Sequence, residues 1–316
     1  MRRAIRWVLP VGLLAAALAA MGFARWSKPA PLDPAAFAAL YAAPLPPPEG
    51  PIAVFHLGHS LVGRDMPAML AQLAGNSYAS QLGWGASLKQ HWTGEVPGFA
   101  EENRPPQFRP AAEAVDSGAY DAVVLTEMVE IRDAVRYHDS ADYLARWAAR
   151  ARAANPGTRV YLYETWHRLD DPSGWLDRID ADLAAQWEGT LLRPALARDG
   201  VGTIHVIPAG QVMARLVREI EAGRVPGLSR REDLFRLNPD GTQDQIHLND
   251  LGAYAVALVH YAVLTHRNPL GLPYRLTRAD GSAADAPTEP AARAMQRIVW
   301  DVVRSYPPSG VAQAGG

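Results

Sequence analysis

The most informative stretch of the sequence is residues 52–63, Ile-Ala-Val-Phe-His-Leu-Gly-His-Ser-Leu-Val-Gly. Its first six residues form a short apolar run of the kind that makes a buried strand. Gly58 and Gly63 flank a tight turn that carries Ser60, and such a turn presents a serine to solvent above a sheet. A helix that follows would offer its N-terminal amides to negative charge. The stretch therefore predicts a strand, a turn with a candidate nucleophile, and a helix.

Similar apolar runs recur along the chain, and segments with helical periodicity separate them. Strands that alternate with helices predict βαβ units and a parallel sheet covered on both faces. We expect one three-layer α/β/α domain with a five-stranded parallel sheet over residues 52–306, followed by a disordered tail at 307–316. The later strands are expected at 78–82, 121–125, 159–164 and 203–208, and longer helices at 175–198, with a break near Pro194, and at 251–264.

A second motif lies near the end of this domain, where Asp244-Gln-Ile-His247 precedes Asn249-Asp-Leu-Gly252 and an apolar helix. The spacing lets one loop hold both the carboxylate and the imidazole. Asp244 can then orient His247 as a general base for Ser60, which is the arrangement that activates a serine for acyl transfer. An α/β-hydrolase elbow, G-x-S-x-G, is the alternative interpretation of the serine. Here the second glycine comes one position late, and the serine follows the first strand of the domain.

These two motifs resemble the first and fifth sequence blocks of the SGNH (GDSL-type) hydrolase superfamily. Gly58-His59-Ser60-Leu61 resembles the Gly-Asp-Ser-Leu block, and Asp244-x-x-His247 matches the Asp-x-x-His block. The resemblance implies a flavodoxin-like fold with strand order 2-1-3-4-5. It also implies that Ser60 is the nucleophile, His247 the general base and Asp244 the residue that orients it.

The resemblance is weaker at the oxyanion hole, where the family uses the nucleophile's amide, a glycine amide and an asparagine. The amide of Ser60 would be the first donor, and Gly85, or alternatively Gly83, would supply the second. The third block should carry an asparagine, but this chain has Glu127, and an ionised carboxylate cannot donate a hydrogen bond. His59, in place of the family's Asp or Asn, predicts different hydrogen bonding beneath the turn.

Other polar and aromatic side chains follow the predicted strands, at the edge where open parallel sheets bind ligands. Tryptophans there are suited to stacking on sugar rings, and histidines and glutamates to binding hydroxyls. The alternative is that these aromatic side chains pack beneath loops, since tryptophan is highly buried on average. We expect a substrate site formed by Trp84, Glu127, Trp166 and His167.

Composition excludes several classes of site. The chain has no cysteine, which excludes thiol catalysis and disulfides, and its net charge of −2 shows no basic stripe for nucleic acid. The histidines lack the spacing of metal ligands, so we expect no metal and no cofactor. The pair Glu127 and Glu130 is too loose a signal for a two-carboxylate glycosidase.

The N-terminal residues are typical of an export signal. Three arginines precede an apolar run at 7–23, which predicts either a cleaved signal peptide or an N-terminal membrane anchor over residues 1–26. Eight prolines in residues 27–51 predict a semi-rigid linker, with a short helical piece at 34–43. We therefore expect an exported protein, periplasmic or tethered to the outer face of a membrane.

The sequence thus predicts an SGNH-like serine esterase that acts through an acyl-enzyme on Ser60. Small-molecule or polysaccharide esters are the expected substrates, and the export signal and the tryptophans favour an O-acetylated carbohydrate. Two alternatives stay open. The same site can pass the acyl group to a sugar, or the chain can be a carbohydrate-binding or assembly protein that has lost efficient catalysis.

Overall fold

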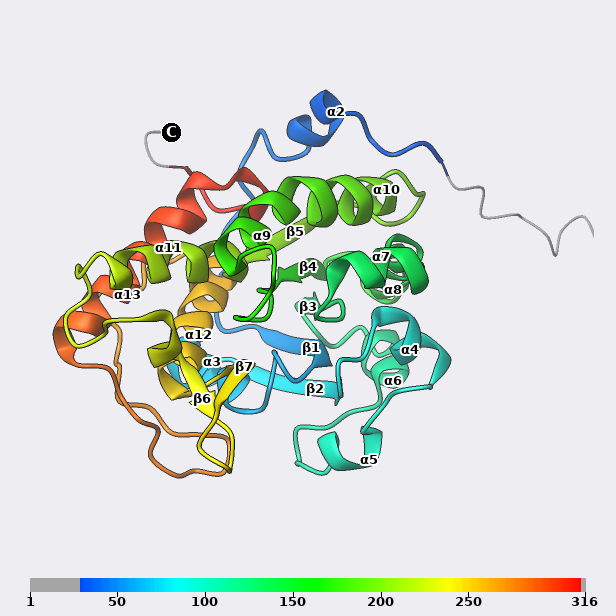
Figure 1. Cartoon of the computed structure of the whole chain (residues 1–316). Helices are drawn as coiled ribbons and strands as arrows, with labels where there is room; N and C mark the ends of the chain where they lie inside the picture. Colours follow the sequence, from blue (N-terminus) through cyan, green and yellow to red (C-terminus); the bar gives the residue numbers. More distant parts are fainter. Residues whose placement is uncertain (1–28, 314–316) are drawn as a thin grey trace, which may run out of the picture.

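Five parallel strands form the central sheet of this protein in the computed structural model, which describes residues 29–313 (Figure 1). The strand order is β2-β1-β3-β4-β5, so the predicted α/β fold and its flavodoxin-like order are confirmed. Each predicted run coincides with a strand to within two residues at either end. The strands are β1 (Ala53–His59), β2 (Ser77–Gly83), β3 (Ala122–Leu125), β4 (Arg159–Glu164) and β5 (Ile204–Pro208).

Helices cover both faces of the sheet and enclose two separate hydrophobic cores (Figure 1). Alternate residues of a strand point to opposite faces, so Val54 enters one core while Phe55 and Leu57 enter the other. The first core contains α3 (Asp65–Ala74), α9 (Trp175–Asp182), α11 (Ala209–Glu221), α12 (Asp250–Thr265) and α13 (Glu289–Ser305). The second contains α4 (Leu88–Thr93), α6 (Ala111–Asp116), α7 (Ile131–Tyr137) and α8 (Ser140–Ala154), and the short α5 (Phe99–Glu102) lies near β2.

The helical stretch after β4 runs without the predicted break. It consists of α9, a π-helical segment η1 (Leu183–Leu192) and α10 (Arg193–Leu196). The hydrogen-bonding pattern changes from π to α where α10 begins. Pro194 therefore lies in a first turn, where its missing amide costs least.

Both ends of the described chain pack on the domain, which differs from the predicted linker and disordered tail. In the N-terminal segment, α2 (Pro34–Ala39) buries Phe37, and the buried Tyr41 hydroxyl donates to the carbonyl of Ile204 at 2.7 Å. After α13, η3 (Pro307–Ser309) is followed by the buried Val311. Aromatic side chains in the first segment account for the difference, because burying each one stabilises the packed arrangement. The predicted signal or anchor lies outside the described residues, and within them no helix has the length and apolarity to span a membrane.

A two-stranded antiparallel hairpin lies outside the main sheet and was not predicted. It is formed by β6 (Phe235–Leu237) and β7 (Gln243–Leu248), and the short helix η2 (Arg231–Leu234) precedes it. Asp244 and His247 belong to β7, not to a loop as predicted. The hairpin therefore carries half of the candidate site.

Candidate active site

An irregularity in the β6–β7 ladder brings Asp244 and His247 together. The ladder pairs residue 235 with 248 and residue 237 with 243, which leaves Arg236 alone opposite the four residues 244–247. In a regular strand, residues three apart point to opposite faces. The excess residues curl β7 so that Asp244 Oδ1 accepts the amides of Ile246 and His247, each at 2.9 Å. The curl allows the carboxylate to reach the imidazole of His247.

Ser60, His247 and Asp244 form a continuous hydrogen-bonded chain. His247 Nε2 lies 3.0 Å from Ser60 Oγ, and His247 Nδ1 lies 2.9 Å from Asp244 Oδ2. Burial alone would raise the pKa of Asp244, but the amides of His247 and Ile246 and the Arg236 guanidinium hold it well below its ordinary value. An ionised Asp244 only accepts, so His247 Nδ1–H donates to it. The Nε2 lone pair then faces the Ser60 hydroxyl, which is the tautomer that a general base requires.

The turn that carries Ser60 is held tightly from behind. Gly58 is required there, because a Cβ atom at this position would lie 2.7 Å from Cβ of Thr126. The buried hydroxyl of Tyr163 donates to the carbonyl of Leu61 at 3.2 Å. These contacts join the turn to the ends of β3 and β4 and leave the serine little freedom to move.

Two buried histidines, both neutral, complete this support. His91 Nδ1 accepts from the Gln81 amide at 2.9 Å, so its Nε2–H donates to the Gly58 carbonyl at 2.8 Å. His59 Nδ1 accepts from the Leu61 amide, so its Nε2–H donates to a backbone carbonyl of the β3 loop at 2.7 Å. Burial lowers the pKa of both His59 and His91 to about 4, against the raising effect of the carbonyls. His59 therefore supplies hydrogen bonds beneath the turn through both of its ring nitrogens.

Two backbone amides are available as oxyanion donors. Gly85 lines the cavity beside Ser60, and its φ of +55° places it in the left-handed region that favours glycine. Among residues 29–313, neither the Ser60 amide nor the Gly85 amide donates a hydrogen bond to another protein group. Gly83 is the less suitable of the two predicted glycines. It packs against Val96, where a Cβ atom would come within 2.4 Å.

Comparison with known proteins adds evidence for the fold. No family model and no curated protein matches the sequence. Among solved structures, a DUF4886 family protein from Bacteroides uniformis matches with a TM-score of 0.52 at 17% identity, over 81% of this chain and 96% of that one. Similar structures also include a proposed SGNH hydrolase from Slackia heliotrinireducens (TM-score 0.40, 21% identity, 69% and 100% covered). A proposed GDSL-like lipase from Parabacteroides merdae matches with a TM-score of 0.41 at 11% identity over 69% and 96%.

The chain shares its α/β fold with the DUF4886 family protein. The strand order and the Ser60–His247–Asp244 chain agree with the resemblance seen in the sequence.

Glu127, which follows β3 where the resemblance expects an asparagine, does not line the cavity. Its side chain is fully buried, and Oε1 accepts the amides of Met128 at 2.8 Å and Leu88 at 3.2 Å. Burial raises the pKa of Glu127 to about 7, although these two hydrogen bonds act in the opposite direction. Glu127 therefore has a structural role in place of the predicted contact with substrate. Glu127 anchors the N-terminus of α4, three residues after Gly85.

Paired substitutions test this role of Glu127. We expect Glu127→Ala to lower the free energy of unfolding by about 2–4 kcal/mol, because it leaves the buried amide of Leu88 and the partly buried amide of Met128 without an acceptor. Glu127→Gln keeps a carbonyl oxygen for both amides and is expected to cost much less. Urea denaturation at pH 6 measures both changes. Equal losses in the two variants would contradict the anchoring role.

A cavity of about 750 Å³ opens beside Ser60 and His247, and two of the predicted substrate residues line it. Trp84 is 55% exposed. Its indole packs against Gly98, which has a φ of +64° and no Cβ atom to block this close contact. Trp166 is completely buried, and its indole N–H donates to the Ile246 carbonyl at 2.9 Å. Trp84 can therefore stack on a ligand, whereas Trp166 forms part of the cavity's base.

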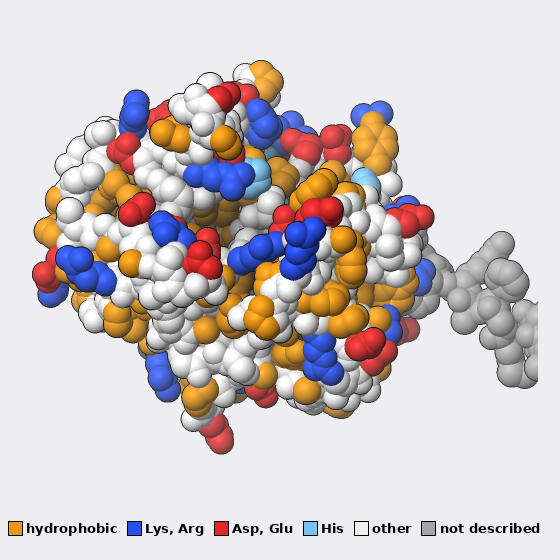
Figure 2. Space-filling view, turned by 90° about the horizontal axis from the view of Figure 1, so that it is seen from below, with side chains coloured by type: hydrophobic (Ala, Val, Ile, Leu, Met, Phe, Trp, Pro, Cys, Tyr) orange, Lys and Arg blue, Asp and Glu red, His pale blue; other side chains and the backbone are white. Residues whose placement is uncertain are grey.

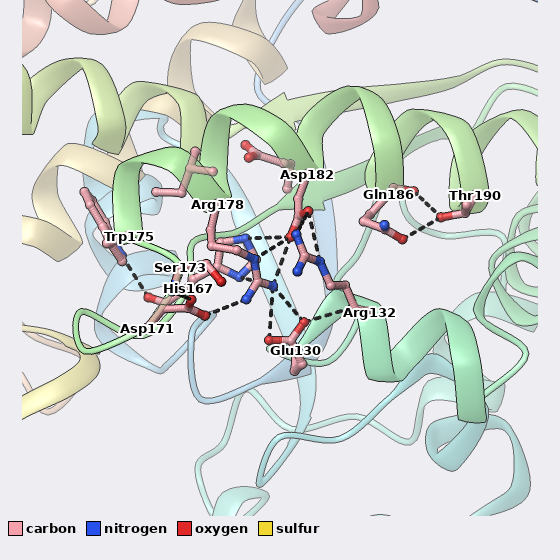
Figure 3. Close-up of polar contacts among 12 residues, drawn as sticks. Glu130, Arg132, His167, Asp171, Ser173, Trp175, Arg178, Asp182, Gln186 and Thr190 are labelled. Carbon is pink, nitrogen blue, oxygen red and sulfur yellow. Dashed lines mark hydrogen bonds and ion pairs between the residues drawn. The ribbon is translucent and has the colours of Figure 1, made fainter.

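His167 does not line this cavity and belongs to an ion cluster behind it (Figure 3). The buried Arg178 is the centre of the cluster, with contacts to Glu130 at 2.9 Å and to Asp182 Oδ2 at 3.0 Å and a shorter one to Asp171. His167 lies 3.3 Å from Asp182, and burial lowers its pKa. The predicted substrate contact of His167 is replaced by a structural one. The cluster ties the loops after β3 and β4 to α9, and both loops reach the cavity next to it.

Residues 29–313 contain no group of three or more histidine, aspartate or glutamate side chains arranged to hold a metal ion. Sequence reasoning missed two contributors to this site, Arg236 and the neutral His91. Arg236 belongs to the unpredicted hairpin, and His91, the histidine between β2 and β3, was considered only as a side chain that could bind substrate hydroxyls.

Proposed function

We propose that this protein is a serine esterase that works through an acyl-enzyme on Ser60. The observation that carries the proposal is the 3.0 Å contact between His247 Nε2 and Ser60 Oγ, with the ionised Asp244 behind the imidazole. In the first step Ser60 Oγ attacks the ester carbonyl carbon, and its proton passes to His247 Nε2. The carbonyl oxygen becomes negative and accepts hydrogen bonds from the amides of Ser60 and Gly85.

The second half of the cycle uses the same groups. The carbon–oxygen bond to the alcohol breaks, and His247 gives its proton to the leaving oxygen. Water then enters, loses a proton to His247 and attacks the acyl-enzyme, which releases the acid and restores Ser60. If a sugar hydroxyl replaces water in this step, the same site is an O-acyltransferase.

A carbohydrate ester is the proposed substrate class. The support is Trp84, an exposed indole at the cavity beside Gly85, in a position suited to a sugar ring. The third possibility, a binding protein with weak catalysis, is supported by the absence of a third oxyanion donor at position 127. One lost donor costs on the order of 10²–10³ in rate, so two remaining amides are compatible with an enzyme.

Labelling with a fluorophosphonate tests the nucleophile directly. We expect the wild-type protein to form a covalent adduct on Ser60 and Ser60→Ala to form none. Mass spectrometry of the intact chain and of its peptides identifies the site. A folded wild-type protein that stays unlabelled would remove the esterase proposal and favour the binding protein.

A further inference from the structure

Three arginines line the cavity that contains Ser60, namely Arg64, Arg168 and Arg236. On the face drawn in Figure 2, charged side chains, many of them blue Lys and Arg, surround a hollow. We propose that the natural ester carries an anionic group, a carboxylate or a phosphate, on its alcohol part, and that Arg168 and Arg236 bind it. This inference rests on the proposed esterase function and narrows its substrate class.

Arg168 and Arg236 lie on the same wall of the cavity as His247. Arg236 is the single β6 residue opposite the curl of β7, and its Nε donates to Asp244 Oδ2 at 2.9 Å. Arg168 follows β4, and the amide of the next residue, Leu169, donates to the Gln245 carbonyl at 2.7 Å. The segment that holds Asp244 and His247 is thus bound by the guanidinium of Arg236 and by the backbone next to Arg168.

Each of these arginines keeps N–H groups for a ligand. Arg236 uses only Nε in its contact with Asp244, and its side chain is 55% exposed. Arg168 uses Nε and Nη2 in its contact with Asp170, a pair in which both side chains are more than half exposed. Exposed pairs of this kind contribute little, so a ligand can compete with Asp170. Neither Asp170 nor Asp244 lines the cavity, whereas both arginines do.

The opposite wall of the cavity differs because its arginine, Arg64, is already paired with Glu102. Glu102 accepts the indole N–H of Trp84 at 2.9 Å, and its other oxygen lies 3.6 Å from Arg64 Nη2. Arg64 also donates to the carbonyl of Glu101 at 2.7 Å. Glu102 lines the cavity together with Arg64, so this wall presents a compensated pair and an aromatic face.

The direction of proton transfer determines whether the alcohol part or the acyl part of the ester lies next to His247. His247 must give its proton to the leaving oxygen, so the alcohol part of the ester lies on the His247 side of Ser60. Substituents of the alcohol then face Arg168 and Arg236. Guanidinium groups bind carboxylate and phosphate through charge-assisted, often paired, hydrogen bonds. An alcohol that bears an anion therefore fits this wall better than a neutral one.

Three aryl acetates that differ only in the para group test the inference on the full chain. They are 4-acetoxybenzoate, 4-acetoxyphenyl phosphate and the neutral 4-acetoxybenzamide. We expect kcat/KM to be at least about tenfold higher for one or both anionic esters than for the amide, mainly through a lower KM. The ratio between the two anionic esters distinguishes a carboxylate from a phosphate as the preferred group.

Arg168→Gln is the informative variant, since Arg168 does not touch the triad. We expect it to lose about tenfold in kcat/KM for the preferred anionic ester and to leave the amide unchanged. Arg64→Gln, on the opposite wall, is the matched control and is expected to keep the preference. If the wild type hydrolyses all three esters equally, or Arg168→Gln slows all three equally, the inference is overturned and the esterase stands. No hydrolysis of any ester, together with no fluorophosphonate adduct, overturns both.

Discussion

Ser60→Ala is expected to lower kcat for an aryl acetate by a factor on the order of 10⁴–10⁶, because no other group supplies the attacking oxygen. His247→Ala is expected to cause a loss of similar size, since an unactivated serine is a weak nucleophile. The double variant should be no slower than either single variant, because the two residues act as one unit. Steady-state kinetics, with circular dichroism to confirm folding, measures all three.

Two substitutions of Asp244 test the triad further, because they remove different parts of its function. Asp244→Asn is expected to lower kcat by a factor on the order of 10⁴, because an amide cannot hold the required tautomer of His247. Asn keeps an oxygen for the amides of Ile246 and His247, so the curl of β7 should persist. Asp244→Ala removes that acceptor as well and should also lower stability. Substantial activity in Ser60→Ala, or independent losses that multiply in the double variant, would contradict the proposed triad.

The second large effect is a steep loss of stability in acid. Both ring nitrogens of His56 and Nε2 of His260 are buried without a hydrogen-bond partner in the described structure, and the two ring centroids are 5.9 Å apart. Burial lowers the pKa of His56 well below 6.5 and that of His260 to about 4. Burial also lowers the pKa of three further buried histidines, His59, His91 and His205, to about 4.

The sign follows from which state binds protons. Below pH 6.5 the unfolded chain protonates these five histidines and the folded chain does not, so their stability is complete above pH 6.5 and is lost toward pH 4. Burial raises the pKa of Glu127 to about 7 and of Glu164 to about 8, which acts with the opposite sign above pH 4.5. The histidines outnumber these two glutamates, so the free energy of unfolding is expected to fall as the pH is lowered from 6.5 toward 4.5.

Urea denaturation between pH 8 and 4.5 measures this slope, and His56→Phe tests its source. The variant has one histidine fewer to protonate, so its slope should fall by about 1.4 kcal/mol per pH unit. Any difference from wild type at pH 8 reports packing alone and serves as the control. An unchanged slope in His56→Phe would show that the buried pair is not responsible.

The sheet could be predicted from the sequence because each strand is a continuous apolar run between segments of helical periodicity. The hairpin could not be found in that way, since β6 is only three residues long and β7 is mostly polar. A local signal for it was present, however. Asp240-Gly241, between β6 and β7, is a typical hairpin turn. The motif Asp244-x-x-His247 nevertheless predicted that these two side chains are neighbours, and they lie 2.9 Å apart.

The residues around the triad could be predicted only in part. A polar residue at the carboxyl end of a strand can point into the cavity or beneath a loop, and distant parts of the chain decide which. Glu127 turns inward because the Leu88 amide, 39 residues away, needs an acceptor there. His167 likewise turns away from the cavity, because it contacts Arg178 and Asp182. The packed N-terminal segment was also missed, because prolines outnumber the two aromatic residues that hold it.

The uncharged state of His59 and His91 affects how the protein should respond to ionic strength. Dissolved ions screen interactions between exposed charges over about 8 Å at physiological salt, but they act little on buried dipoles. The turn that carries Ser60 is held by neutral imidazoles, so the position of Ser60 should not change at high salt concentration. The arginine wall is exposed and charged, so capture of an anionic ester should weaken there. Salt would then raise KM and leave kcat almost constant.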